Sequence, residues 1–173
     1  MVVKLLLNSL AGGGAERVAV SLLKVLSIER VFLLERDVKY PVPQGVLEFL
    51  SNHTTGTNPI WKSLFIPAYA LRLAKKLRGQ DLVLSMLERA NYVNIIASFF
   101  SGHRALVSVR MSQISGRGKR HPYNLLSRLL YPKAHLLICV SKAVAKELAL
   151  FYGVPWEKIE VIYNPVFLDE VVS

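Results

Sequence analysis

Short apolar runs of strand length alternate with segments of helical periodicity along the chain, and this alternation constrains the fold more than any other feature. Strands are predicted at 2–7, 31–34, 46–50, 82–85, 104–109, 136–140 and 159–163. Helices are predicted at 15–26, 67–78, 90–100, 123–131 and 142–152. Strands that are apolar on both faces and alternate with helices form a parallel sheet covered on both sides. We therefore expect a doubly wound, mainly parallel, Rossmann-like α/β sheet of about six or seven strands, with helices on both faces.

Length and composition exclude several classes of protein. The 173 residues suffice for one α/β domain, and 52% of them are hydrophobic, which excludes general disorder. No apolar stretch reaches the roughly 18 residues that a membrane span needs, and the first residues do not form a signal peptide. The single cysteine, Cys139, excludes an internal disulfide, and the four histidines show no metal-binding spacing. We expect a cytoplasmic protein with no bound metal and no tightly held cofactor.

The charge is strongly one-sided. The net charge is +10, and residues 49–146 contain only Asp81 and Glu88 as acids. Such a field favours an anionic partner, either phosphates, a lipid surface or nucleic acid, although a solvated basic face would give the same composition.

A glycine-rich loop joins the first predicted strand to the first predicted helix. Gly12, Gly13 and Gly14 let main-chain amides approach an anion at a helix N-terminus, although a tight turn without a ligand would need the same residues. Arg17 stands where the dinucleotide-binding fingerprint has glycine or alanine, so nicotinamide binding is kept only as an alternative. In a parallel sheet the functional loops lie at the carboxyl ends of the strands, which here are 8–14, 85–91, 110–121 and residue 141.

Four segments, taken in order, resemble the N-terminal domain of family 4 glycosyltransferases, which have the GT-B fold. Residues 13–18 (GGAERV) resemble the family's G-G-A-E-R opening, and 84–87 (LSML) with Asn91 resemble its S-x-L…N segment. Residues 107–110 (VSVR) resemble V-S-E-R, with Val109 in place of the usual glutamate. Residues 140–144 (VSKAV), 153–155 (GVP), 158–159 (KI) and 161–166 (VIYNPV) resemble the end of that domain.

The resemblance implies an enzyme that transfers a sugar from a nucleotide-sugar to an acceptor with retention of configuration. It places residues 1–166 in the N-terminal, acceptor-binding domain and 167–173 at the start of a linker to a C-terminal donor-binding domain. That second domain carries the family's E-x7-E carboxylates and would act in cis or in trans. We therefore expect an isolated acceptor-binding half that does not turn over alone.

The substrate-binding candidates follow from the same resemblance and from their places at strand ends. Gly13 and Gly14 would border the donor diphosphate and the acceptor in the closed cleft, and Glu16 in the first helical turn is a further substrate-binding candidate. Arg110 would pair an acceptor phosphate or form a structural ion pair. The remaining two candidates, Ser85 and Asn91, would bind acceptor hydroxyls or cap a helix. No catalytic residue is identified, and His121 is the candidate, with an ordinary surface histidine as the alternative.

The resemblance also suggests a lipid-linked acceptor and an anionic membrane as partners. A surface for a membrane or an anionic acceptor is predicted from basic residues, four of which follow the aromatics Trp61 and Phe65, with peripheral docking at the inner face of the membrane. Its basic residues are Arg72, Lys75, Lys76, Arg78, Arg117, Lys119 and Arg120. A basic nucleic-acid-binding module remains the alternative from a different class, although the sequence shows no nucleic-acid-binding motif.

Overall fold

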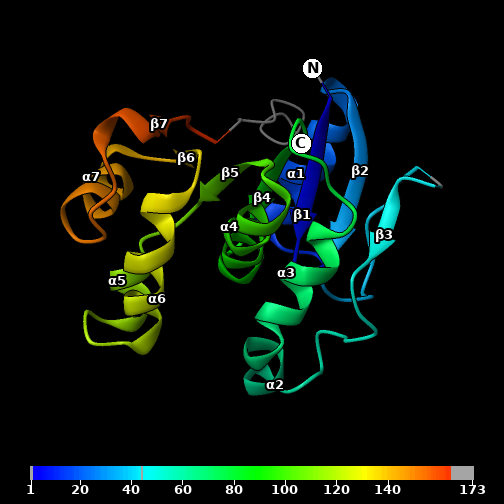
Figure 1. Cartoon of the computed structure of the whole chain (residues 1–173), viewed down its shortest axis with the longest axis horizontal. Helices are drawn as coiled ribbons and strands as arrows, with labels where there is room; N and C mark the ends of the chain where they lie inside the picture. Colours follow the sequence, from blue (N-terminus) through cyan, green and yellow to red (C-terminus); the bar gives the residue numbers. More distant parts are fainter. Residues whose placement is uncertain (1, 44, 165–173) are drawn as a thin grey trace, which may run out of the picture.

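The protein is built on one seven-stranded, fully parallel sheet. A computed structural model describes residues 2–43 and 45–164 (Figure 1). The strand order is β3-β2-β1-β4-β5-β6-β7. The strands are β1 (Val3–Leu7), β2 (Ile28–Leu33), β3 (Leu47–Phe49), β4 (Leu82–Met86), β5 (Arg104–Val109), β6 (Leu136–Cys139) and β7 (Ile159–Val161). The order reverses between β1 and β4, which creates the switch point where ligands of doubly wound folds bind.

Helices cover both faces of the sheet, but unequally. The helix α1 (Gly14–Val25) packs against the face that carries Leu5, Leu7 and Leu33. Four other helices cover the opposite face, which carries Leu6 and Phe32 (Figure 1). They are α3 (Ile66–Ala74), α4 (Glu88–Ser101), α6 (Pro122–Leu130) and α7 (Lys142–Leu150). Two short α-helices, α2 (Pro59–Leu64) and α5 (Gln113–Arg117), and two 3₁₀ helices, η1 (Tyr131–Lys133) and η2 (Trp156–Lys158), complete the described fold.

The prediction of a doubly wound, mainly parallel sheet is confirmed, and each predicted strand and helix is present within a few residues of its predicted bounds. The two short helices were not predicted, because their residues were assigned to loops at 52–59 and 111–121 or left without an element. The helix predicted at 67–78 ends four residues early, at Ala74, where the chain turns and the Arg78 amide donates to Asp81 Oδ2 at 2.7 Å. The domain boundary at 166 and the linker at 167–173 lie outside the described residues.

A buried polar network fixes α4 against the sheet. The Asn94 side-chain amide donates to the main-chain oxygens of Val83 and Leu106 at 3.0 and 3.1 Å, and to Ser85 Oγ at 3.0 Å. Its Oδ1 lies 2.8 Å from His103 Nε2. Because these contacts join α4 to β4 and β5, they set the position of the α4 N-terminus at the carboxyl edge of the sheet.

Candidate functional site

A cavity of about 810 Å³ lies at the carboxyl edge of the sheet, beside the switch point. The loops after β1, β4 and β5 form its walls, as the strand order requires. Its lining comprises residues 13–18, 108–113 and 116–117, together with Leu87, Glu88, Asn91 and Asn164. Five of the six predicted substrate-binding residues are thereby brought together: Gly13, Gly14, Glu16, Asn91 and Arg110.

The glycine loop ends on Gly13, which is the N-cap of α1 and supplies no capping side chain. A Cβ atom at Gly13 would lie 2.2 Å from Glu16 Oε2, whereas one at Gly14 would meet nothing within 4 Å. A side chain at Gly13 would therefore displace the end of the flexible Glu16 side chain, whose carboxylate folds back over this glycine. A carboxylate in the first turn is stabilised by the helix dipole, and it offsets part of the positive potential of the helix end.

Asn91 reaches the cavity from the first turns of α4. Its side chain is 1% exposed, and its amide nitrogen donates to the main-chain oxygen of Ser108 at 3.0 Å. Its Oδ1 is buried and has no hydrogen-bond partner among the described residues. A buried carbonyl oxygen without a donor costs about 1–3 kcal/mol, so Asn91 Oδ1 has an unused capacity to accept a hydrogen bond.

Ser85, the sixth candidate, lies elsewhere. It is completely buried, it accepts from the Asn94 amide, and its hydroxyl donates to the main-chain oxygen of Leu106 at 3.4 Å. It does not line the cavity. Ser85 therefore belongs to the buried polar network and not to the pocket, because its side chain points from β4 toward Asn94 of α4.

Leu87 holds an unusual backbone conformation in the cavity wall. Its φ is 75° and its ψ is 147°, and no other non-glycine residue among those described has a positive φ. Such a conformation costs a residue with a Cβ about 1–3 kcal/mol and is concentrated at functional sites. The strain lies at the N-cap of α4, one residue before Glu88, and it sets the angle at which α4 enters the pocket.

Arg110 follows the last residue of β5 and projects into the cavity. Its guanidinium donates to Asn164 Oδ1, and burial lowers its pKa below the usual value. Because this arginine remains charged at any physiological pH, the cavity holds a partly desolvated cation that no described acid neutralises. This arrangement suits the binding of an anion such as a phosphate.

Arg117 was predicted to belong to a surface for a membrane or an anionic acceptor. It lines the cavity and forms an ion pair with Glu88. Burial lowers the pKa of Arg117, but the hydrogen bond and the charge of Glu88 outweigh this and raise it above the usual value. Of the predicted membrane or anionic-acceptor surface, Arg117 is thus the member that lies in the cavity wall, where Glu88 pairs its charge.

His121 caps a helix and lies outside the cavity lining. It is the N-cap of α6, where its Nδ1 accepts from the Tyr123 amide at 3.2 Å. The centroid of its ring lies 5.3 Å from that of the Tyr123 ring. The structure therefore shows a capping role and does not bring His121 to the other candidates.

The other predicted surface cations stay outside the cavity, and several have partners. Arg72 donates to the main-chain oxygen of Leu50 at 2.7 Å and lies over the Phe65 ring, and Lys76 pairs with Glu48. The remaining four, Lys75, Arg78, Lys119 and Arg120, are exposed. In the described part of the chain, no group of three His, Cys, Asp or Glu side chains could hold a metal ion.

Leu87 and Glu88 lie in the cavity wall within the predicted functional loop 85–91, but neither was singled out as a substrate-binding candidate. Glu88 had a signal, because it is one of only two acids within residues 49–146 and it follows a strand end. Leu87 had none, since nothing in a leucine predicts a positive φ.

The fold and the cavity define a class: doubly wound α/β proteins with a ligand-sized cavity at the carboxyl edge of the sheet. The family model described as Glycosyltransferase Family 4 matches residues 12–170, and the chain belongs to this family. The family assignment favours a glycosyltransferase over a nucleic-acid-binding or nicotinamide-binding protein.

Individual relatives agree with this assignment. The chain is 32% identical to the N-acetylgalactosamine-N,N'-diacetylbacillosaminyl-diphospho-undecaprenol 4-alpha-N-acetylgalactosaminyltransferase of Campylobacter jejuni, over 94% of this chain and 47% of that protein. Among solved structures, Anabaena HepE in complex with UDP has a TM-score of 0.70 at 19% identity, covering 98% of this chain and 45% of that one. A glycosyltransferase from Rickettsia africae has a TM-score of 0.54 at 17% identity, covering 96% and 44%. The chain thus spans about half the length of these proteins.

Proposed function

We propose that this chain is the acceptor-binding half of a glycosyltransferase. The complete enzyme would move a sugar, with retention of configuration, from a nucleotide-sugar to a lipid-linked glycan. A C-terminal domain, in cis or in trans, would bind the donor, and this half alone would not turn over. The observation that carries the proposal is the cavity at the switch point, which the partly buried cation Arg110 and the buried amide side chain of Asn91 both line.

The chemistry of the cavity fits a molecule that has both a phosphate and sugar hydroxyls. Arg110 supplies positive charge for a diphosphate. Asn91 Oδ1 offers an acceptor for a hydroxyl or an amide N–H. The name of the Campylobacter relative specifies a saccharide on diphospho-undecaprenol, and a molecule of this class has both kinds of group. We therefore assign a polyprenyl-diphosphate-linked glycan as the acceptor.

The test is equilibrium binding of a short-chain analogue, N-acetylgalactosaminyl farnesyl diphosphate, measured by calorimetry. Arg110→Ala should weaken binding at least tenfold, since a charge-assisted phosphate contact contributes about 1.5–3 kcal/mol. Arg104→Ala is the matched control, because Arg104 is an exposed cation at the opposite end of the same strand. Equal affinities of the two variants would refute the proposed site. Mixing the chain with this analogue and UDP-N-acetylgalactosamine should give no product.

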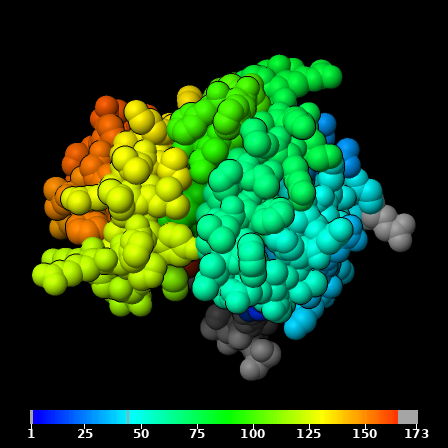
Figure 2. Space-filling view, turned by 60° about the horizontal axis from the view of Figure 1, so that its bottom comes forward, coloured from blue at the N-terminus to red at the C-terminus, as the bar shows by residue number. Residues whose placement is uncertain are grey.

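We further propose that the helix α2 docks this half on an anionic membrane. Its apolar side chains Ile60, Trp61 and Leu64 are 68%, 62% and 65% exposed. Figure 2 shows α2 (teal) and the α5–α6 segment (yellow-green) on one face, and Ser63 and Tyr123 join the two by a hydrogen bond. The exposed cations Lys119 and Arg120 precede α6. Apolar side chains next to cations suit the interface of an anionic bilayer. In the described part of the chain, no helix is long and apolar enough to cross a membrane.

Sedimentation with phosphatidylglycerol vesicles tests this docking. Binding should fall with salt and should be lost in a Trp61→Ser/Leu64→Ser double variant. Leu150→Ser is the control, because Leu150 is equally apolar and exposed but ends α7. Docking through α2 is refuted if the double variant sediments like the unmodified protein at low salt.

A further inference from the structure

The carboxylate of Glu88 stands in the cavity wall with one oxygen bound and one oxygen open. Glu88 is the first residue of α4, and its side chain is 31% exposed. Arg117 Nη1 and the Tyr92 hydroxyl both donate to Oε1. Within residues 2–43 and 45–164, Oε2 has no hydrogen-bond or ion-pair partner. The carboxylate is therefore oriented through one oxygen while the other remains available to a ligand.

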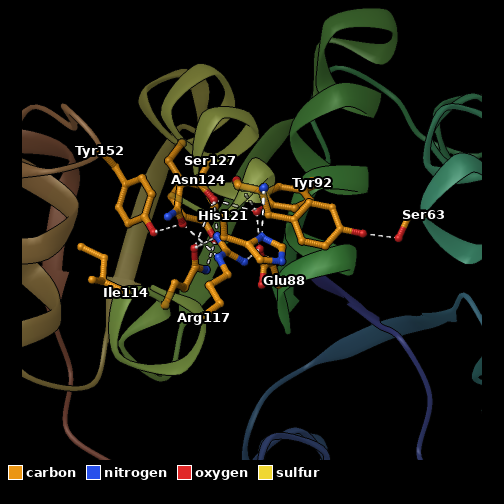
Figure 3. Close-up of polar contacts among 12 residues, drawn as sticks. Ser63, Glu88, Tyr92, Ile114, Arg117, His121, Asn124, Ser127 and Tyr152 are labelled. Atoms are coloured by element: carbon orange, nitrogen blue, oxygen red, sulfur yellow. Dashed lines mark hydrogen bonds and ion pairs between the residues drawn. The ribbon is translucent and has the colours of Figure 1, made fainter. Parts of the chain in front are cut away.

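A polar network behind Glu88 fixes this orientation, as Figure 3 shows. Arg117 Nε donates to Asn124 Oδ1 at 2.9 Å, and Nη2 donates to Gln113 Oε1 at 3.0 Å. Asn124 is in turn fixed, because its amide donates to the main-chain oxygens of residues 118 and 119 and its Oδ1 accepts from the Tyr152 hydroxyl. The arginine thus has defined partners on three sides and cannot rotate to bind Glu88 with two nitrogens.

The geometry differs from that of an ion pair built only to join two helices. Such a pair is commonly bidentate, with two parallel N–H···O bonds that use both carboxylate oxygens. Here Arg117 donates to Oε1 of Glu88 and not to Oε2. Its other N–H groups donate to neutral amide and hydroxyl oxygens, including Ser127 Oγ at 3.4 Å. Because Glu88 lines the cavity, its second oxygen remains for the space in which the acceptor would lie.

We propose that Glu88 Oε2 accepts a hydrogen bond from a hydroxyl of the acceptor's terminal sugar and thereby selects among acceptor sugars. This inference rests on the proposed function and extends it. An ionised carboxylate only accepts hydrogen bonds, so it binds hydroxyl donors and repels phosphate. The sugar then lies toward α4 and α5, and the diphosphate lies toward Arg110. Arg117 and Tyr92 act as positioning residues for the carboxylate.

The test uses methyl N-acetyl-α-galactosaminide and its 3-, 4- and 6-deoxy analogues, titrated into the full chain and followed by amide NMR shifts. With the unmodified protein, one deoxy analogue should bind about tenfold more weakly than the parent glycoside, as expected when a charge-assisted hydrogen bond is lost. With Glu88→Gln, the parent should bind about tenfold more weakly, and that same analogue should lose nothing further. Such non-additivity identifies a direct contact, which a merely structural role of Glu88 would not produce.

The outcomes separate this inference from the proposed function. If the unmodified protein does not bind the parent glycoside at all, both the sugar-acceptor assignment and the role of Glu88 fail. If it binds the parent but Glu88→Gln binds it equally well, only the role of Glu88 is refuted. The deoxy series on the unmodified protein needs no variant, and equal affinities for all four glycosides would also overturn the inference.

Discussion

Protonation of His103 should destabilise the fold as the pH falls below neutrality. The imidazole is 4% exposed, and burial lowers its pKa from 6.5 to about 4, with Lys4 adding to the effect and Asp81 opposing it. The tautomer is defined by its neighbours. Asn94 turns its amide nitrogen toward main-chain oxygens, so its Oδ1 faces His103 and requires the proton on Nε2. His103 Nδ1 then accepts from the Ser101 hydroxyl at 2.5 Å.

The size and sign of the effect follow from the two pKa values. Between pH 6.5 and pH 4 the unfolded chain binds a proton at His103 that the folded chain does not, so the free energy of unfolding falls as the pH falls. Moving from pH 7.5 to pH 5.0 should cost about 2 kcal/mol from this one group.

Urea unfolding of the unmodified protein and of His103→Gln at both pH values provides the assay. The glutamine keeps a donor for Asn94 and does not titrate, so the unmodified protein should lose about 2 kcal/mol more than the variant on acidification. All other titrating groups are common to the two proteins and cancel in the difference. Equal pH dependence of the two proteins would refute the assignment of a buried neutral imidazole.

Two further perturbations test the strain and the buried charges around the cavity. The free energy of unfolding of Leu87→Gly should be about 1 kcal/mol higher than that of Leu87→Ala. Alanine is ordinarily the more stabilising of the two residues, but only glycine adopts a positive φ without strain. The opposite order in urea unfolding would contradict the strain at Leu87. Glu35→Ala should destabilise the fold by about 3 kcal/mol. Glu35 Oε1 accepts from Lys62 Nζ at 3.1 Å and from Arg89 Nη1 at 2.8 Å, so removal of the carboxylate leaves these cations buried without a partner. A destabilisation below about 1 kcal/mol in the same measurement would show that water reaches these cations.

The strands were predictable from sequence because they are buried on both faces and form continuous apolar runs. The short helices α2 and α5 were not predicted, although each has a local cap: Asn58 Oδ1 accepts from the Ile60 amide at 2.9 Å and Ser112 Oγ accepts from the Ser115 amide at 3.1 Å. The helix α5 also depends on a tertiary contact. The N-terminus of α5 is capped by Glu147, whose carboxylate accepts from the Gln113 and Ile114 amides at 2.9 and 3.2 Å although it lies more than 30 residues away. No local pattern reveals such a partner.

The candidate site was predictable to the extent that topology determines it. Parallel strands bring their carboxyl ends to one edge, so Gly13, Asn91 and Arg110 meet as expected. Which side chains turn into the cavity depends on packing. Ser85 turns into the core and Arg117 turns inward to Glu88, and the sequence contains no signal for either orientation.

Amide NMR mapping with the farnesyl-diphosphate-linked sugar tests the central claim most directly. The account predicts that the largest shift changes occur at the carboxyl edge, at Gly13, Gly14, Glu88, Asn91 and Arg110. Shift changes concentrated at the opposite edge of the sheet, around Lys4, Asp81 and Arg104, would contradict it.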